Sequence, residues 1–137
     1  MNTNQTIYKT LNNKDPFQLI EVSRDGVDFG MFSTLVCDMP FSINDWSKIL
    51  HISERTIQRY KRENRKFDSI HSDRLIEIIL LLDKGIEVFG NSNNFTIWLE
   101  SANIALGGIK PKDLLDNTFG IGLLKDELVK IEHGILA

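Results

Sequence analysis

The residues best suited to chemistry are basic, and they crowd into one stretch of the chain, residues 48–66. Seven of the 16 lysines and arginines lie there beside two acidic residues, so this stretch carries a charge of +5. Because the whole chain carries −3, the remaining residues sum to −8. A local basic stretch in an acidic protein is typical of a module that touches phosphates with one face. A solvated helix face is the alternative, and it is the more common origin of a basic run.

The side chains of this stretch also have the donors and acceptors that read base edges in the major groove. If a helix begins at Glu54, steps of about 100° place Ile57 and Tyr60 on one side and the arginines on the opposite side. A solvated structural helix would show the same pattern. The base-reading residues predicted on this face are Arg55, Gln58, Arg59 and Arg62, and those predicted nearer the phosphates are Lys61, Arg65 and Lys66.

Catalytic and metal-binding motifs are not found in the sequence. His51, His71 and His133 are scattered, and Cys37 is the single cysteine. Neither closely spaced histidines nor a Cys-x-x-Cys pair is present, so the residues give a metal site little support. Gly107-Gly108 lacks the lysine and hydroxyl residue of a phosphate-binding loop. We therefore expect no metal, no cofactor and no enzymatic activity.

Apolar residues recur at helical spacing along the chain, which predicts an all-α fold. Short helices are expected from Pro16 to Arg24 and from Phe29 to a point before Pro40. Ser42 is expected to cap the next helix and Ser53 the one after it, because a serine hydroxyl accepts an unpaired backbone N–H. The three residues His51 to Ser53 lie between these two helices, which is the spacing of a helix-turn-helix.

A longer helix is predicted from Asp73 to Phe89, with Ser72 as its cap and Gly90 at its end. Its apolar residues cover most of its circumference, so the helix needs burial on more than one side. We expect it to be both the centre of its domain and part of a dimer contact. The residues predicted for this core and dimer contact are Leu75, Ile79, Leu82, Ile86 and Phe89.

Three shorter segments are expected after the long helix. Asn93 or Asn94 is predicted to cap the first, and Pro111 is predicted in the first turn of the second, which carries Leu114 and Leu115. The last helix places an apolar stripe from Ile121 to Ile131 and ends at Gly134.

Two parts of the chain resemble one protein family. The segment FSINDWSKILHISERTIQRYK resembles the helix-turn-helix of Xre-type regulators, although His51 stands where glycine is typical. The pieces SDRLIEI, EVFG, WL, ALGG, KPKDLL and KIEHG, in that order, resemble the C-terminal toxin-binding domain of Xre/MbcA/ParS antitoxins. Lys110 departs from the family, which usually has threonine or a similar capping residue there. The start of that helix is therefore expected to be less well capped.

This resemblance implies an antitoxin that binds a RES-domain toxin, an enzyme acting on NAD, and blocks its active-site entrance with its C-terminal part. A frayed terminus is the alternative reading of the same residues. The candidate toxin-binding residues are Lys130, Ile131, His133, Gly134, Ile135, Leu136 and Ala137.

The expected organisation is a flexible segment 1–14, a helix-turn-helix domain 15–69 and a toxin-binding domain 70–137. Operator DNA and the toxin are the expected partners, and a homodimer is expected because paired helix-turn-helix units read paired half-sites. No run is long enough to span a bilayer and no signal peptide is evident, so the chain is expected in the cytoplasm. A stand-alone transcriptional regulator and a protein-binding module with a degenerate helix-turn-helix are the alternatives.

Overall fold

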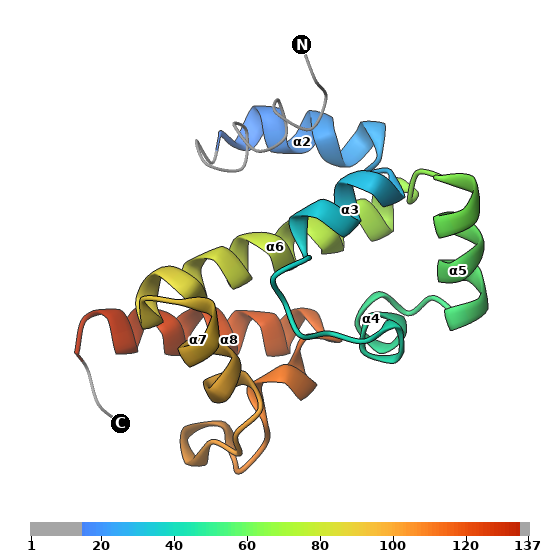
Figure 1. Ribbon diagram of the computed structural model, residues 1–137. Coiled ribbons are helices and arrows are strands. Elements are labelled where there is room, and N and C mark those ends of the chain that lie inside the picture. The colour runs from blue at the N-terminus through green and yellow to red at the C-terminus, as the bar shows by residue number, and fades with distance from the viewer. Residues whose placement is uncertain (1–14, 135–137) are drawn as a thin grey trace.

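The computed structural model describes residues 15–134, which fold into helices joined by short turns (Figure 1). No strand occurs among these residues, and the prediction of an all-α fold is confirmed. The elements in chain order are α2 (Pro16–Asp25), α3 (Phe29–Leu35), α4 (Ile43–Leu50), α5 (Glu54–Glu63), α6 (Ser69–Phe89), α7 (Ser92–Leu99), the 3-10 turns η1 (Ile104–Leu106) and η2 (Pro111–Leu114), and α8 (Thr118–Glu132).

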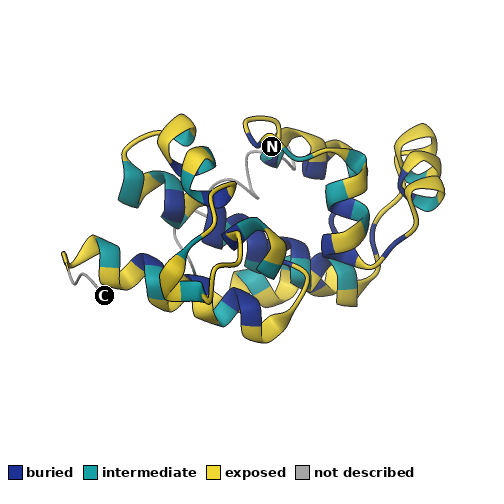
Figure 2. Ribbon diagram, turned by 90° about the horizontal axis from the view of Figure 1, so that it is seen from below, coloured by how far each residue is buried: buried dark blue, intermediate teal, exposed yellow. Residues whose placement is uncertain are grey.

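The longest helix, α6, lies at the centre of the molecule, and α2, α7 and α8 pack against it (Figure 1). Its side chains Leu75, Ile78 and Ile79 are buried among these neighbours. Figure 2 shows the buried segments concentrated where the helices face one another. An apolar surface that covers most of a helix is thus buried by elements of the same chain on several sides.

Helix α7 approaches α6 closely because α6 carries a glycine at the crossing. A Cβ atom at Gly85 would overlap the ring of Phe95, which is fully buried. Phe95 stacks with Phe89 at a centroid distance of 5.8 Å and with Trp98 at 5.9 Å. The missing side chain at position 85 therefore makes room for an aromatic cluster that joins the two helices.

The caps of the helix-turn-helix are as predicted. The Ser42 hydroxyl accepts the Asp45 backbone N–H at 3.1 Å, and the Asp45 carboxylate accepts the Ser42 backbone N–H at 2.9 Å. These two bonds form a capping box at the start of α4. The Ser53 hydroxyl accepts the Thr56 backbone N–H at 3.1 Å at the start of α5.

Two predicted caps are wrong. Helix α6 begins one turn earlier than expected, because the Asp68 carboxylate accepts the His71 backbone N–H at 2.9 Å. Ser72 is instead buried inside the helix, where its hydroxyl accepts the Val27 N–H at 2.9 Å and donates to the Phe67 carbonyl at 3.1 Å.

The cap of α7 is Asn91, whose side chain accepts the Asn94 N–H at 2.7 Å, rather than Asn93 or Asn94 itself. Both wrong caps have one cause. Several capping residues lie within four positions of each other, and the sequence alone does not say which of them has the extended backbone that a cap requires.

The segment before α8 also differs from the expected pair of helices. The residues after Pro111 form only the 3-10 turn η2, which has no side-chain cap at Lys110, as expected for this departure from the family. Helix α8 begins at Thr118, with Asn117 as its cap, so Gly120 lies inside the helix. A Cβ atom at Gly120 would overlap the Leu114 carbonyl, so this glycine allows η2 to fold back onto α8.

One continuous apolar core connects all these elements, from Val27 and Met31 in the first half to Leu124 and Leu128 in the second. None of the helices described in residues 15–134 is long and apolar enough to cross a membrane.

Candidate DNA-binding face and toxin-binding half

Helix α4, a three-residue turn and helix α5 form the helix-turn-helix. His51 ends α4 in the left-handed conformation, at φ 57° and ψ 41°, which is the backbone shape that glycine usually provides in this turn. The Ser47 hydroxyl donates to the Ile52 carbonyl at 2.6 Å and secures the turn from the side of α4. Trp46 and Ile57 are buried beneath it. The departure at His51 thus leaves the motif intact.

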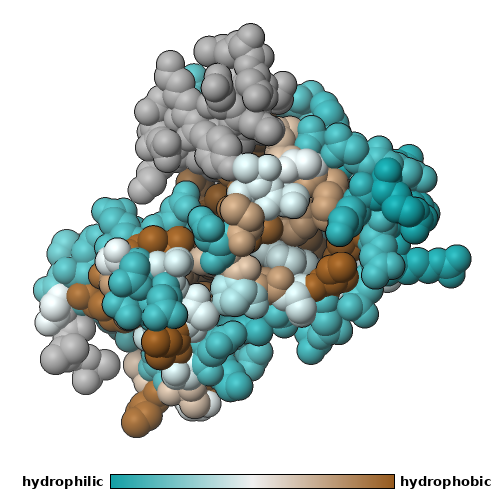
Figure 3. All heavy atoms as spheres, in the orientation of Figure 1, coloured by the Kyte–Doolittle hydropathy of each residue, from teal (hydrophilic) through white to brown (hydrophobic). Residues whose placement is uncertain are grey.

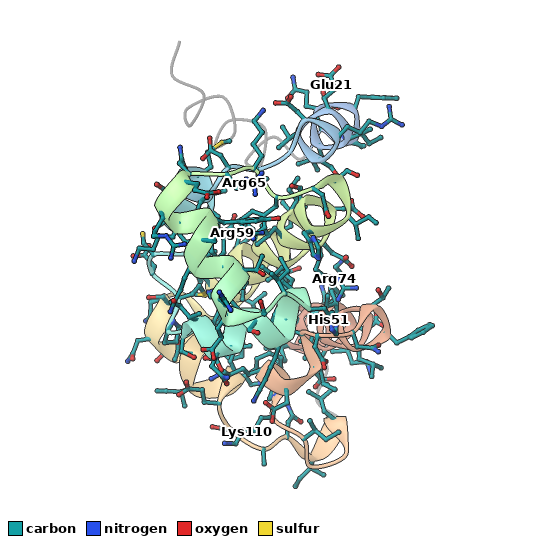
Figure 4. The ribbon with its side chains drawn as sticks, turned by 90° about the vertical axis from the view of Figure 1, so that its right-hand side faces the viewer. Glu21, His51, Arg59, Arg65, Arg74 and Lys110 are labelled. Carbon is teal, nitrogen blue, oxygen red and sulfur yellow. The ribbon has the colours of Figure 1, made fainter. Side chains whose placement is uncertain are left out.

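Helix α5 has the two opposite faces that the sequence predicts. Ile57 is 2% exposed and points into the core. Figure 4 looks onto the outer face of α5, where Arg59 is labelled. Among residues 15–134 neither Arg55 nor Arg62 has an ion-pair partner, and Gln58 is exposed beside them. The outer face therefore presents guanidinium and amide groups whose hydrogen-bonding capacity is unused, which suits contact with base edges.

Arg65 and Lys66, which follow α5, are held by other residues of the chain. Arg65 pairs with Glu63 at 3.4 Å, and Lys66 pairs with Asp25 at 3.4 Å. Both basic side chains remain 54% exposed, and exposed pairs of this kind contribute little free energy. These two pairs can therefore open at small cost in favour of phosphates.

Two polar contacts join the helix-turn-helix to the segment that precedes α8, and the sequence analysis did not anticipate them. The Lys112 ammonium lies 3.1 Å from the Asp45 carboxylate, and the His51 Nε2 atom lies 2.8 Å from the Asp116 backbone carbonyl. Figure 4 shows His51 beside α8. We call these two contacts the joint. The turn in front of α5 is thus fixed by residues of both halves.

The Asp45 carboxyl group belongs both to the joint and to the capping box. Partial burial on its own raises the pKa of this group, but the Ser42 backbone N–H and the Lys112 ammonium together outweigh burial and hold its pKa below the usual value. Asp45 is consequently ionised at neutral pH, which keeps both the cap and the joint in place.

The predicted toxin-binding residues lie at the end of α8. Lys130, His133 and Gly134 are exposed, and Ile131 is half-buried. Residues 135–137, the apolar end of the predicted surface, lie outside the described residues. Glu132 pairs with Lys84 of α6, and this hydrogen bond raises the pKa of the Lys84 ammonium. The last turn of α8 is therefore fixed to α6.

The residues predicted for the core and dimer contact divide into two groups. Leu75, Ile79 and Leu82 are buried within the single chain, whereas Ile86 and Phe89 are half-buried. The contact with a second chain stays a prediction. Elsewhere in residues 15–134, Cys37 is a free, exposed thiol, and no group of three His, Cys, Asp or Glu side chains is placed to hold a metal ion.

Two family models match the chain, one for each half. The Antitoxin Xre-like helix-turn-helix domain matches residues 18–79, and the Antitoxin Xre/MbcA/ParS C-terminal toxin-binding domain matches residues 84–134. The chain belongs to the Xre/MbcA/ParS antitoxins. The second match covers α7, η1, η2 and α8, so this antitoxin combines a helix-turn-helix with a toxin-binding domain.

Three relatives have similar sequences over most of the antitoxin. The Prs ADP-ribosylating antitoxin of Sphingobium sp. is 24% identical, over 95% of this chain and 87% of the relative. The Antitoxin Xre of Photorhabdus laumondii is 27% identical, over 69% of this chain and 70% of the relative. The Antitoxin Xre of Yersinia enterocolitica is 25% identical, over 82% of this chain and 80% of the relative.

A solved structure has the same fold. One chain of the M. tuberculosis MbcT-MbcA toxin-antitoxin complex superposes with a TM-score of 0.60 at 21% identity. The match covers 77% of this antitoxin and 94% of that chain.

Proposed function

We propose that this antitoxin binds and inhibits a RES-domain toxin that consumes NAD, and that it represses its own operon through α5. The observation that carries the DNA-binding part is the outer face of α5, where Arg55 and Arg62 are exposed and have no ion-pair partner among residues 15–134, while Ile57 anchors the helix. The protein acts in the cytoplasm, on operator DNA, and carries out no chemistry of its own.

The toxin class is supported by the order of short motifs in the second half. The name of the Sphingobium relative gives further support, because it refers to ADP-ribosylation, a reaction that uses NAD as donor. The MbcT-MbcA structure is described as a toxin-antitoxin complex, which is consistent with a toxin partner for this fold. In this proposal the end of α8 and the tail, residues 130–137, close the entrance to the active site of the toxin.

A homodimer is part of the proposal because a single recognition helix covers only one half-site. Two copies related by a two-fold axis read two half-sites one helical turn apart. Residues 15–69 form the DNA-binding unit and residues 70–137 form the toxin-binding unit.

Co-expression tests the proposal directly. The neighbouring open reading frame is expressed alone and together with the antitoxin, and growth, cellular NAD and activity of the operon promoter are measured. We expect the neighbour alone to lower NAD and arrest growth, and we expect the antitoxin to restore both and to silence the promoter. Promoter control without any rescue would instead support a stand-alone regulator.

A double variant, Arg55→Ala with Arg59→Ala, separates the two activities. It should lose promoter repression and still rescue growth, because α5 belongs to the first half and the toxin-binding domain to the second. Loss of rescue in this variant would contradict the division of labour.

A further inference from the structure

The segment between α7 and η2 is an ordered loop with an isoleucine at its outer end. The Asn103 backbone N–H donates to the Ile109 carbonyl at 3.1 Å, and the Gly108 N–H donates to the Asn103 carbonyl at 2.8 Å. The Asn103 side chain also accepts the Ala105 N–H at 2.9 Å. These bonds close the loop on itself, and Gly107 and Gly108, both at positive φ, make the return possible.

Both ends of this loop are anchored in the core. Leu99 is 1% exposed at one end, Pro111 is buried at the other, and Leu106 packs against the core between them. A loop held in this way loses little conformational freedom when a partner binds it.

The outer surface of the loop is apolar and uncharged. Ile104 is 96% exposed and Ile109 is 44% exposed, and Ile97, in the last turn of α7 before the loop, is 59% exposed. No charged residue occurs from Ser101 to Ile109. Figure 3 shows hydrophobic side chains at the lower tip of the molecule, where Figure 1 places this loop. Depletion of charge around an apolar side chain is typical of the central part of a protein interface.

The position of the loop within the chain indicates its partner. The whole loop lies in residues 84–134, which match the toxin-binding domain. Figure 1 places it far from α5, so DNA on α5 leaves it accessible. We infer that Ile104, supported by Ile97 and Ile109, inserts into an apolar pocket on the surface of the toxin and anchors the complex independently of the C-terminal tail. This inference rests on the proposed function, since it assigns a second surface to the same partner.

The outer face of α8 is the competing surface. Phe119 and Leu123 are 84% and 54% exposed, but the charged residues Asp126 and Lys130 lie on the same face of the helix and are also exposed. Desolvating those charges costs free energy that the uncharged loop does not. The loop is therefore the better anchor.

The test compares Ile104→Ser with Ile70→Ser in binding to the protein product of the neighbouring open reading frame, measured by calorimetry on full-length proteins. Ile70 is the matched control because it is 77% exposed on the first turn of α6 and lies outside residues 84–134, the segment that matches the model of the toxin-binding domain. We expect Ile104→Ser to weaken binding by about 10-fold or more, as for a central interface residue, and Ile70→Ser to leave it unchanged. Equal thermal melting of the two variants and the wild type excludes misfolding as the cause.

Three results would overturn the inference while leaving the proposed function in place. The first is wild-type affinity in Ile104→Ser. The second is a loss confined to Phe119→Ser, which would assign the toxin to α8. The third is a change in the oligomeric state of the antitoxin alone in Ile104→Ser, which would mean that a second copy covers the loop. A wild-type chain that does not bind the toxin at all would instead refute the proposed function.

Discussion

Arg59 lies on the outer face of α5, with its guanidinium 5.8 Å from the centre of the Tyr60 ring. This contact holds the charged group on the exposed side of the helix. If Arg59 reads a base, Arg59→Ala should weaken operator binding by roughly 1 to 3 kcal/mol. Fluorescence anisotropy with the gene's own promoter, measured over a range of salt concentrations, gives the affinity. Arg24→Ala, at an exposed arginine of α2, is the control, and wild-type affinity in Arg59→Ala would exclude a base contact.

His51 adopts a left-handed backbone conformation that is usually found at glycine. A β-branched side chain is strongly disfavoured at φ 57°, whereas asparagine tolerates it. We therefore expect His51→Val to lower the free energy of unfolding by about 1 to 2 kcal/mol more than His51→Asn does. Urea denaturation measures both values. Equal stability of the two variants would show that the turn relaxes to another conformation.

At the scale of the elements, alanine substitutions at two helical glycines should change the stability in opposite directions. A methyl group at Gly85 meets the Phe95 ring, whereas a methyl group at Gly122 of α8 meets nothing within 4 Å. Gly85→Ala should therefore destabilise the fold by about 1 to 3 kcal/mol through overpacking. Gly122→Ala should stabilise it by about 0.5 to 1 kcal/mol through helix propensity. Urea denaturation measures the free energy of unfolding of both variants. A change of the same sign in both would contradict the close packing of α6 and α7.

The start of α4 should respond to acid through Asp45. The pKa of this carboxyl is lower in the folded state than in the unfolded chain, so its contribution to stability is complete above about pH 4 and is lost as the pH falls through the folded value. We expect Asp45→Asn to be less stable than the wild type at pH 7, and the difference to narrow below about pH 4. Urea denaturation across this pH range measures the free energy of unfolding of both proteins, and Asp126→Asn is the exposed control. A difference between wild type and Asp45→Asn that stayed constant with pH would contradict the prediction.

The elements themselves could be predicted well where one signal had no competitor. Ser42 and Ser53 were assigned correctly as caps, because each stands directly before the first residue of its apolar pattern, and the spacing of Ile57 against the arginines correctly predicted the two faces of α5. Prediction failed at α6 and α7, where Asp68 and Asn91 compete with later polar residues. It also failed before α8, where Pro111 begins only a 3-10 turn and Gly120 lies inside the helix as a contact point.

At the scale of the whole molecule, we expect the core to stay folded when the end of the chain is deleted. Glu132 should be kept, because its pair with Lys84 fixes the last turn of α8 to α6. Deletion of residues 133–137 should therefore leave the melting temperature nearly unchanged and weaken toxin inhibition in co-expression. Lys130→Ala, at an exposed site on the same predicted toxin-binding surface, is measured in the same two assays. Full rescue of growth by the truncated chain would show that inhibition acts through another surface.

Contacts between distant segments could not be predicted from the sequence. The joint depends on Lys112 and on the backbone carbonyl of Asp116, and neither belongs to a local pattern around Asp45 or His51. Periodicity and caps are properties of single elements, whereas the joint exists only because packing of α4 against α6, and of α6 against α8, brings its two sides together.

The joint also limits how such proteins can be recombined. A chimera that takes its first 90 residues from one relative and the remainder from another keeps α6 whole but separates Asp45 from the Lys112 partner that it has here. Fusions should fold best when residues 45 and 112 come from the same relative, whereas the partner of His51 is a backbone carbonyl that any residue at position 116 provides. A substitution at Lys112 in the second half should therefore also affect the start of α4, even though the helix-turn-helix does not bind the toxin in the proposed arrangement.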